Sequence, residues 1–150
     1  MAHTYTDLLF HVIFSTKDCA PLLDAKFKPR LFPYLGGIIR ELGGSALLIN
    51  GPSDHVHILV SLSAKTALSE IVGKVKANSS GWVHREFTEK QAFAWQTGYA
   101  AFSVSHSQKE SVLDYIAKQE EHHRKMSFQE ELVRFLKKHE VEYEERYLWD

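Results

Sequence analysis

The order of strand-like and helix-like segments constrains the fold of this chain more than any other feature of its sequence. Alternating or unbroken apolar residues predict strands, whereas apolar residues three and four positions apart predict helices. The strand pattern occurs in residues 8–16, 45–50, 55–62 and 99–105. The helix pattern occurs in residues 25–42, 66–79, 107–123 and 127–139. Up to residue 105 the order is therefore strand, helix, strand, strand, helix, strand.

This order is the βαββαβ pattern of ferredoxin-like folds, so we predict an α+β protein with an antiparallel sheet and a C-terminal helical extension. The turn residues Gly51-Pro52-Ser53-Asp54 predict a hairpin between the second and third strands. Helices packed on one face of such a sheet would leave the other face free for a site or a partner.

The helices after the last strand have clear start signals. Ser107 with Glu110, and Ser127 with Glu130, form S-x-x-E capping boxes, which begin helices. Two earlier helices contain residues that disfavour helix. Proline is tolerated only in a first turn, so regular helix within residues 25–42 is expected to begin near Pro33.

The helix that begins at Thr66 meets Ser79-Ser80-Gly81, which is expected to end or bend it.

The composition fits one ordinary domain. The chain has 150 residues, 44% of them hydrophobic and 25% charged, which is enough to fill a core. We predict one domain over residues 1–150, in which residues 127–150 form the helical extension and an acidic tail. The single cysteine, Cys19, excludes an intrachain disulfide and fits a reducing cytosol, so we expect a cytoplasmic protein. No signal peptide and no apolar run of the ~20 residues that span a membrane is recognisable.

The charge distribution is ambiguous about nucleic acid. A formal net charge of −1 argues mildly against a duplex-DNA binder, which usually has a basic surface. However, acidic residues gather in the tail, whereas Lys74, Lys76 and Arg85 lie in the middle of the chain. A basic working face is therefore compatible with the sequence.

Two residue pairs have the spacing of a functional site. His55 and His57 are two positions apart in a predicted strand, so both imidazoles point to one face and could hold one metal ion. Tyr115 and Gln119 are four positions apart in a predicted helix, so the hydroxyl and the amide face the same point. Each pair alone also has an ordinary explanation, either surface histidines or a packed tyrosine bonded to a glutamine.

Together, the two pairs resemble the single-tyrosine HUH transposases of insertion sequences and their domesticated relatives. The blocks that carry the resemblance occur in the order of that family and cover nearly the whole chain. They are Phe14-Ser15-Thr16-Lys17, Asp54-His55-Val56-His57-Ile58-Leu59-Val60, Trp95 with Gly98-Tyr99, Phe102-Ser103-Val104-Ser105, and Tyr115-Ile116 followed by Gln119 and His122-His123.

The resemblance implies an enzyme that cuts and rejoins single-stranded DNA at hairpin-marked ends. Tyr115 would attack the scissile phosphate, which gives a 5′-phosphotyrosine and a free 3′-OH, and a second DNA end would reverse the step. His55, His57 and Gln119 would bind the metal. Family members are typically homodimers in which the tyrosine helix often completes the partner's histidine site, so the resemblance implies a homodimer as well.

The chemistry of these side chains agrees with such roles. A tyrosine hydroxyl has a pKa of about 10, so it is a poor nucleophile at neutral pH unless a dication lowers the barrier. Two imidazoles and an amide oxygen leave the metal's charge available to a phosphate. Mg²⁺ or Mn²⁺ is expected, although imidazoles would also suit Zn²⁺.

Several further residues could contact DNA. Lys74, Lys76 and Arg85 could bind phosphates, although a solvated helix face explains them nearly as well. His122 falls on the helix face of the nucleophile and could bind a phosphate or assist proton transfer. A solvent-exposed position is the simpler expectation for both His122 and His123.

The remaining aromatic and histidine residues have structural explanations. His11 is expected in the core or behind the histidine pair. Trp82 and Trp95 are expected to pack in the core, with stacking on unpaired bases, worth about 1–3 kcal/mol per base, as the alternative.

Two other functions stay open at the level of sequence. One is a non-catalytic or domesticated hairpin-binding protein, which would not need Tyr115. The other is a metal-dependent hydrolase in which the metal activates water. No general base is obvious for it, because Asp54 should face away from His55 in a regular strand.

Overall fold

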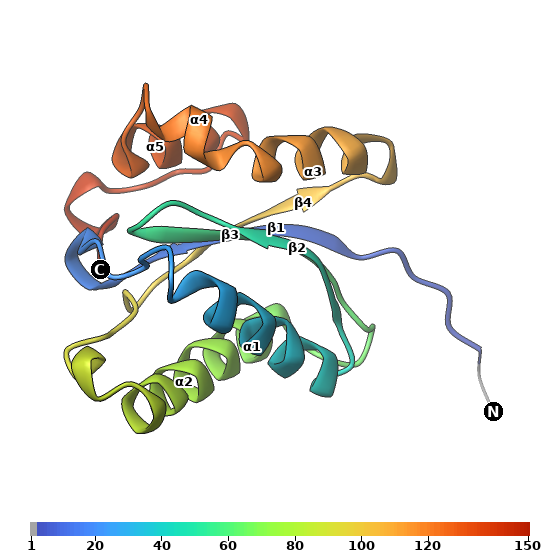
Figure 1. The fold of residues 1–150 in the computed structure, drawn as a ribbon. Helices are drawn as coiled ribbons and strands as arrows, with labels where there is room; N and C mark the ends of the chain where they lie inside the picture. The colour runs from blue at the N-terminus through green and yellow to red at the C-terminus, as the bar shows by residue number, and fades with distance from the viewer. Residues whose placement is uncertain (1–2) are drawn as a thin grey trace.

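The computed structural model describes residues 3–150, which form a four-stranded antiparallel sheet with helices on both faces (Figure 1). The strands are β1 (Leu9–Ser15), β2 (Ser45–Asn50), β3 (His55–Ser61) and β4 (Ala100–Val104), in the spatial order β2-β3-β1-β4. The helices are α1 (Lys28–Glu41), α2 (Leu68–Glu86), α3 (Lys109–Ala117), α4 (Gln119–His123) and α5 (Phe128–Lys138). The predicted βαββαβ order and antiparallel sheet are confirmed, including the β2–β3 hairpin.

The expectation that one face of the sheet stays free is wrong. Helices α1 and α2 cover one face, and α3, α4 and α5 cover the other (Figure 1). The chain turns back over the sheet after β4, so the C-terminal extension becomes a third layer. A site on this second face is therefore enclosed between strands and helices.

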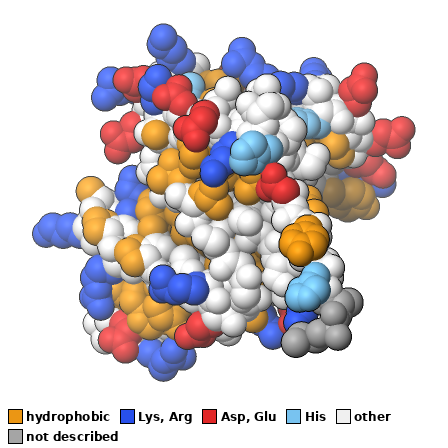
Figure 2. Space-filling view, turned by 90° about the vertical axis from the view of Figure 1, so that its right-hand side faces the viewer, with side chains coloured by type: hydrophobic (Ala, Val, Ile, Leu, Met, Phe, Trp, Pro, Cys, Tyr) orange, Lys and Arg blue, Asp and Glu red, His pale blue; other side chains and the backbone are white. Residues whose placement is uncertain are grey.

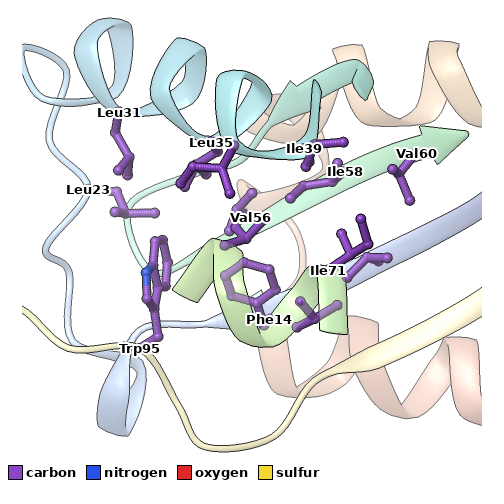
Figure 3. Close-up of a cluster of buried hydrophobic side chains, with 14 of the residues drawn as sticks. Phe14, Leu23, Leu31, Leu35, Ile39, Val56, Ile58, Val60, Ile71 and Trp95 are labelled. Carbon is purple, nitrogen blue, oxygen red and sulfur yellow. The ribbon is translucent and has the colours of Figure 1, made fainter. Parts of the chain in front are cut away.

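The larger core lies between the sheet and the helices α1 and α2 (Figure 3). Alternate residues of β1 and β3 point into it, which is the period of two that a half-polar strand predicts. Its buried members include Val12, Phe14, Val56, Ile58, Val60, Leu31, Leu35, Ile39, Ile71, Val72 and Val75.

A smaller apolar cluster fastens α5 to the opposite face of the sheet. It consists of Ile13, Phe102, Phe128, Leu132 and Leu136. These side chains fix which face of α5 points toward the strands, and thereby position the polar residues of that helix face.

Two helices differ from their predicted bounds for local reasons. Helix α1 begins earlier, at Lys28, because the Asp24 carboxylate accepts hydrogen bonds from the backbone N–H groups just before it, including Phe27 N at 2.9 Å. Helix α2 continues through residues 79–81 to Glu86. There Ser79 is buried and its Oγ accepts a hydrogen bond of 2.9 Å from Trp95 Nε1, so the serine has a packing role.

The predicted helix over residues 107–123 is broken. It divides at Lys118, whose φ of −100° and ψ of 26° are not helical. Ser127 caps α5 by accepting a bond from Glu130 N, as predicted, but Ser107 does not cap α3, which follows a 3-10 turn.

The turn before β3 is built tightly against that strand. A Cβ at Gly51 would collide with the carbonyl oxygen of His55, so a residue without a side chain is required there.

The two tryptophans that were predicted to pack in the core differ in burial. Trp95 is buried, whereas the half-buried Trp82 stacks on Tyr34 with ring centroids 4.3 Å apart.

Candidate functional site

His55 and His57 lie on the sheet face that is covered by α3–α5. Both side chains are fully buried, and their Nε2 atoms are 3.2 Å apart. Val56 and Ile58 point to the opposite core. The predicted pairing of the two imidazoles is thus present in the structure.

Each histidine is held by a partner on its other ring nitrogen. The Asp54 carboxylate lies 2.7 Å from His55 Nδ1, and His11 Nε2 lies 2.8 Å from His57 Nδ1. Such partners fix ring orientation and tautomer in metal sites. The position expected for His11, behind the pair, is confirmed. Asp54 does not face away from His55, because it precedes β3 and is free of the strand's alternation.

Glu131 of α5 brings a carboxylate into the centre of the site. Its Oε1 is 3.1 Å from His55 Nε2, 3.0 Å from His57 Nε2 and 3.0 Å from His123 Nε2. One ligand atom from each of these four residues lies within 4.8 Å of the others. Three imidazoles and a carboxylate therefore converge on one small volume.

The contact between His55 and Glu131 requires a cation. A carboxylate can only accept, so His55 donates Nδ1–H to Asp54, and a neutral ring then presents a lone pair at Nε2. That lone pair faces a carboxylate oxygen at 3.1 Å. A proton or a metal ion must lie between the two atoms.

The protonation equilibria of the cluster reflect this arrangement. Burial alone would lower the pKa of His55, but Asp54 and Glu131 raise it above its ordinary value. Burial lowers the pKa of His57 to about 4, against the opposing effect of Glu131. Burial disfavours the Glu131 carboxylate, yet the bonds from the surrounding histidines hold its pKa far below the usual range. Glu131 is therefore charged and available to a cation.

Tyr115 of α3 reaches the same cluster within one chain. Its hydroxyl donates to Glu131 Oε2, and its ring stacks on His122 with centroids 4.3 Å apart. Burial raises the pKa of Tyr115 well above its ordinary value, and the bond to Glu131 raises it further, whereas Gln119 and Arg134 act in the opposite direction. Without a cation in the cluster, the hydroxyl is thus held in its protonated form.

Gln119 lies one turn beyond Tyr115, at the start of α4. Its side chain is fully buried, and its Oε1 has no hydrogen-bond partner among residues 3–150. Its Nε2 lies 3.4 Å from the carbonyl oxygen of Tyr115. A buried amide oxygen without a partner is unfavourable, and a cation would satisfy it. The four clustered ligand atoms of His55, His57, His123 and Glu131 fit a metal ion by themselves, and the unpartnered Gln119 oxygen is a further potential ligand near Tyr115.

The lysines and the arginine expected to contact DNA are far from this cluster. Lys74, Lys76 and Arg85 are all on α2, across the sheet (Figure 1). Lys74 pairs with Glu70 at 3.1 Å. Lys76 donates to carbonyl oxygens of residues 96–98, and burial lowers its pKa to about 8, so it fastens that loop.

The expectation of solvent-exposed His122 and His123 is wrong. The side chain of His123 is 9% exposed and belongs to the cluster. His122 covers the ring of Tyr115, and its Nε2 is buried without a partner among the residues that the structure describes. Both histidines belong to α4, which begins after the break at Lys118.

Sequence reasoning missed Glu131, although α5 carries a signal for it. The apolar positions of α5 include Phe128, Leu132 and Phe135, and Glu131 lies between them on the same helix face. A carboxylate on the apolar face of an amphipathic helix is seldom buried without a partner. That position marks an acid with a specific role.

Comparison with known proteins identifies the family and the fold of the chain. Residues 4–119 match the sequence profile of the family described as IS200-like transposases. No functionally curated protein sequence matches the chain. His123 and Glu131, the C-terminal members of the cluster, lie beyond the residues that match the family profile.

Two solved structures share the fold. A candidate transposase from Deinococcus radiodurans R1 is 21% identical, with 79% of this chain and 96% of that chain covered and a TM-score of 0.65. A REP-associated tyrosine transposase bound to a REP hairpin is 12% identical, with 82% and 73% covered and a TM-score of 0.62. Among the helices of residues 3–150, none combines the length and the apolar character needed to cross a membrane. Since the family match covers the four strands and continues as far as Gln119, the chain belongs to the IS200-like transposases.

Proposed function

We propose that this transposase cuts and rejoins single-stranded DNA through a covalent bond between Tyr115 and a 5′-phosphate. One observation carries the proposal: the Tyr115 hydroxyl and the two Nε2 atoms of His55 and His57 contact the same carboxylate, Glu131. The nucleophile and the predicted metal-binding pair therefore form one site, although about 60 residues separate them in the sequence.

The residues proposed to hold the metal are His55, His57 and Gln119, as the family resemblance implies. Glu131 and His123 are added to them because their ligand atoms lie in the same cluster. A bound divalent ion, Mg²⁺ or Mn²⁺, would polarise the phosphate and favour the tyrosine anion. With Glu131 in the set, the ion would also offset the negative charge that raises the pKa of Tyr115.

The remaining steps belong to the side chains. Tyr115 Oη forms the bond to phosphorus as the bond from phosphorus to the 3′-oxygen breaks. The phenolic proton lies on the hydrogen bond to Glu131 Oε2, so this carboxylate is placed to receive it and to return a proton to the leaving oxygen. Reversal with a second DNA end conserves the phosphodiester energy, so no nucleotide cofactor is needed.

The substrate is proposed to be single-stranded DNA with hairpins at its ends. A homodimer is the proposed assembly. In the family that the chain resembles, the tyrosine helix often completes a partner's site, whereas here Tyr115 lies at the histidines of its own chain. Mixing Tyr115→Phe protein with His57→Ala protein separates the two arrangements, because only exchanged helices would restore an intact site and its activity.

The test of the proposal is a covalent adduct. Single-stranded oligonucleotides that tile the DNA on both sides of the gene, together with synthetic hairpin-bearing strands, are incubated with the protein and Mn²⁺ and run on denaturing gels. The wild type is expected to give a protein–DNA adduct, Tyr115→Phe none, and the exposed-tyrosine control Tyr147→Phe a normal amount. An adduct that persists in Tyr115→Phe would end the assignment, and binding without cleavage on every substrate would favour a hairpin-binding protein.

A metal-dependent hydrolase is the second candidate, and Glu131 is the observation that favours it. The buried carboxylate supplies the general base that was not apparent in the sequence. This function predicts a free 5′-phosphate product and turnover that survives Tyr115→Phe. The hydrogen bond that joins Glu131 to Tyr115 favours the transposase instead.

A further inference from the structure

Two adjoining cavities open beside Tyr115. The first has a volume of about 340 Å³, within the range of small-ligand sites. Its lining includes Tyr115, Val112, Met126, Phe135, Arg134 and Lys138. The second cavity, of about 650 Å³, shares Met126, Arg134 and His122 with the first and adds Arg124 and Lys125.

The cations of the first cavity are available to a ligand. Arg134 and Lys138 are exposed and four positions apart on α5, so they project from one helix face. Neither forms an ion pair with a carboxylate within residues 3–150. By contrast, Lys74 and Lys76 on α2 are already engaged by Glu70 and by backbone carbonyls.

The wall between the two cavities has an unsatisfied donor or acceptor. His122 lines both of them, and its Nε2 is buried without a partner among the described residues. Because its ring stacks on Tyr115, that nitrogen lies close to the nucleophile. A polar ligand atom at this wall would satisfy it.

General electrostatic attraction does not explain binding to DNA. Both basic and acidic side chains occur around the rim of the face in Figure 2, and its centre is largely uncharged. The net charge of −1 agrees with this picture. Affinity for a nucleic acid must therefore come from local sites that combine cations with an apolar wall.

We propose that the 340 Å³ cavity holds one unpaired nucleotide next to the scissile phosphate, with its base on Met126 and Phe135 and a phosphate on Arg134 and Lys138. This inference rests on the proposed function, because it places the nucleotide beside Tyr115. It assigns DNA contacts to α5 and removes them from α2.

The first experiment measures binding of an oligothymidylate of six nucleotides, with a fluorescent label, to the full chain carrying Tyr115→Phe. In this uncleaving background, Arg134→Gln and Lys138→Gln are each expected to weaken binding about 3- to 10-fold. Each should also reduce the slope of log affinity against log salt by about 0.7. The matched control, Lys137→Gln on the same helix, is exposed and outside the cavity lining, so it should bind as the background protein does.

The second experiment asks whether the cavity binds a base as well as a phosphate. Thymidine 3′,5′-bisphosphate is titrated by NMR against the same protein, beside the abasic deoxyribose 3′,5′-bisphosphate. Loss of the base is expected to weaken binding roughly 5- to 150-fold, the equivalent of one stacked base. Equal binding of the two probes would overturn the proposal that the base packs on Met126 and Phe135.

The outcomes separate this inference from the proposed function. Normal adduct formation by the wild type, together with unchanged DNA binding by the Arg134→Gln and Lys138→Gln variants, would reject the nucleotide site and leave the transposase mechanism standing. Base-dependent binding that these variants weaken, without any adduct from the wild type, would uphold the site and reject the mechanism.

Discussion

The two faces of the central sheet are equally buried but have opposite characters. On one face, Val56 and Ile58 are buried in the apolar core that lies between the sheet and the helices α1 and α2. On the other, His55 and His57 are also buried, yet their ring nitrogens face Asp54 and other polar groups. One strand supplies both faces because its side chains alternate. An apolar face is satisfied by packing alone, whereas a polar face at the same depth needs partners and a cation.

The largest effects should come from single substitutions at two adjacent residues of β3 that point to opposite faces of the sheet. His57→Gln is expected to abolish the covalent adduct while the protein stays folded. Ile58→Ala is expected to lower the free energy of unfolding by about 2–5 kcal/mol, because it leaves a cavity in the larger core, while the folded fraction retains cleavage. Gel assays and urea unfolding measure the two effects. Adduct formation by His57→Gln would show that the polar face does not carry the chemistry.

Glu131→Gln should weaken Mn²⁺ binding by more than about 100-fold, since it removes the carboxylate at the centre of the cluster. Isothermal titration calorimetry without DNA measures the metal directly, and the exposed acid Glu120 provides the control Glu120→Gln. Unchanged Mn²⁺ affinity in Glu131→Gln would mean that the carboxylate serves Tyr115 alone.

Asp54→Asn should weaken metal binding about 10- to 100-fold, because it loses the anion that orients His55 from outside the cluster. The fold should be retained, since Asp54 is partly exposed. The same titration tests this, with circular dichroism as the check on folding. An affinity equal to that of the wild type would leave the orienting role without support.

Acid should destabilise the polar face of the metal-free protein. Burial lowers the pKa of His57 to about 4 and that of His11 to about 3. As pH falls from about 6.5 toward these values, the unfolded chain binds more protons than the folded one. The free energy of unfolding should therefore fall by at most about 1.4 kcal/mol per pH unit for each histidine.

The raised pKa of His55 acts in the opposite sense, because its contribution is present at low pH and is lost as pH rises through the folded value. Urea unfolding of chelator-treated protein between pH 7 and pH 5 measures the sum. His11→Gln is expected to flatten the pH dependence. A midpoint that rises toward pH 5 would mean that His55 dominates.

The smallest effects should be those of the basic residues on α2. Lys74→Gln and Arg85→Gln are expected to change the free energy of unfolding by less than about 0.5 kcal/mol, since exposed charges contribute little. Adduct yield should stay within about twofold of the wild type. A large loss of DNA affinity in either variant would indicate that DNA binds to α2 and would contradict the proposed contacts on α5.

The sequence alone predicted the order of strands and helices and the antiparallel sheet, because these patterns are local and periodic, but it did not predict that α3–α5 cover the second face (Figure 1). The alternation around His55 and His57 predicted the polar face of β3. The spacing of Tyr115 and Gln119 predicted one shared helix face, but the helix breaks at Lys118, so the two residues lie on α3 and α4. Both sequence patterns are local and can be recognised without knowledge of long-range packing.

Helix ends were less predictable, because they involve tertiary contacts that no local pattern reports. Ser79 bonds to Trp95, and the Asn50 amide donates to the carbonyl oxygens of Ile116 and Ala117 at the end of α3.

Only the tertiary structure decided how the site is completed. The chain folds its C-terminal helices over the second face, so Glu131 and His123 meet residues that lie more than 60 positions earlier in the sequence. The apolar cluster beneath α5 positions Glu131 against the histidines. Packing between distant segments leaves no periodic pattern in the sequence, so it could not be predicted from the sequence. The sequence therefore singled out Tyr115 and the histidine pair, and the fold supplied the Glu131 carboxylate that all three contact.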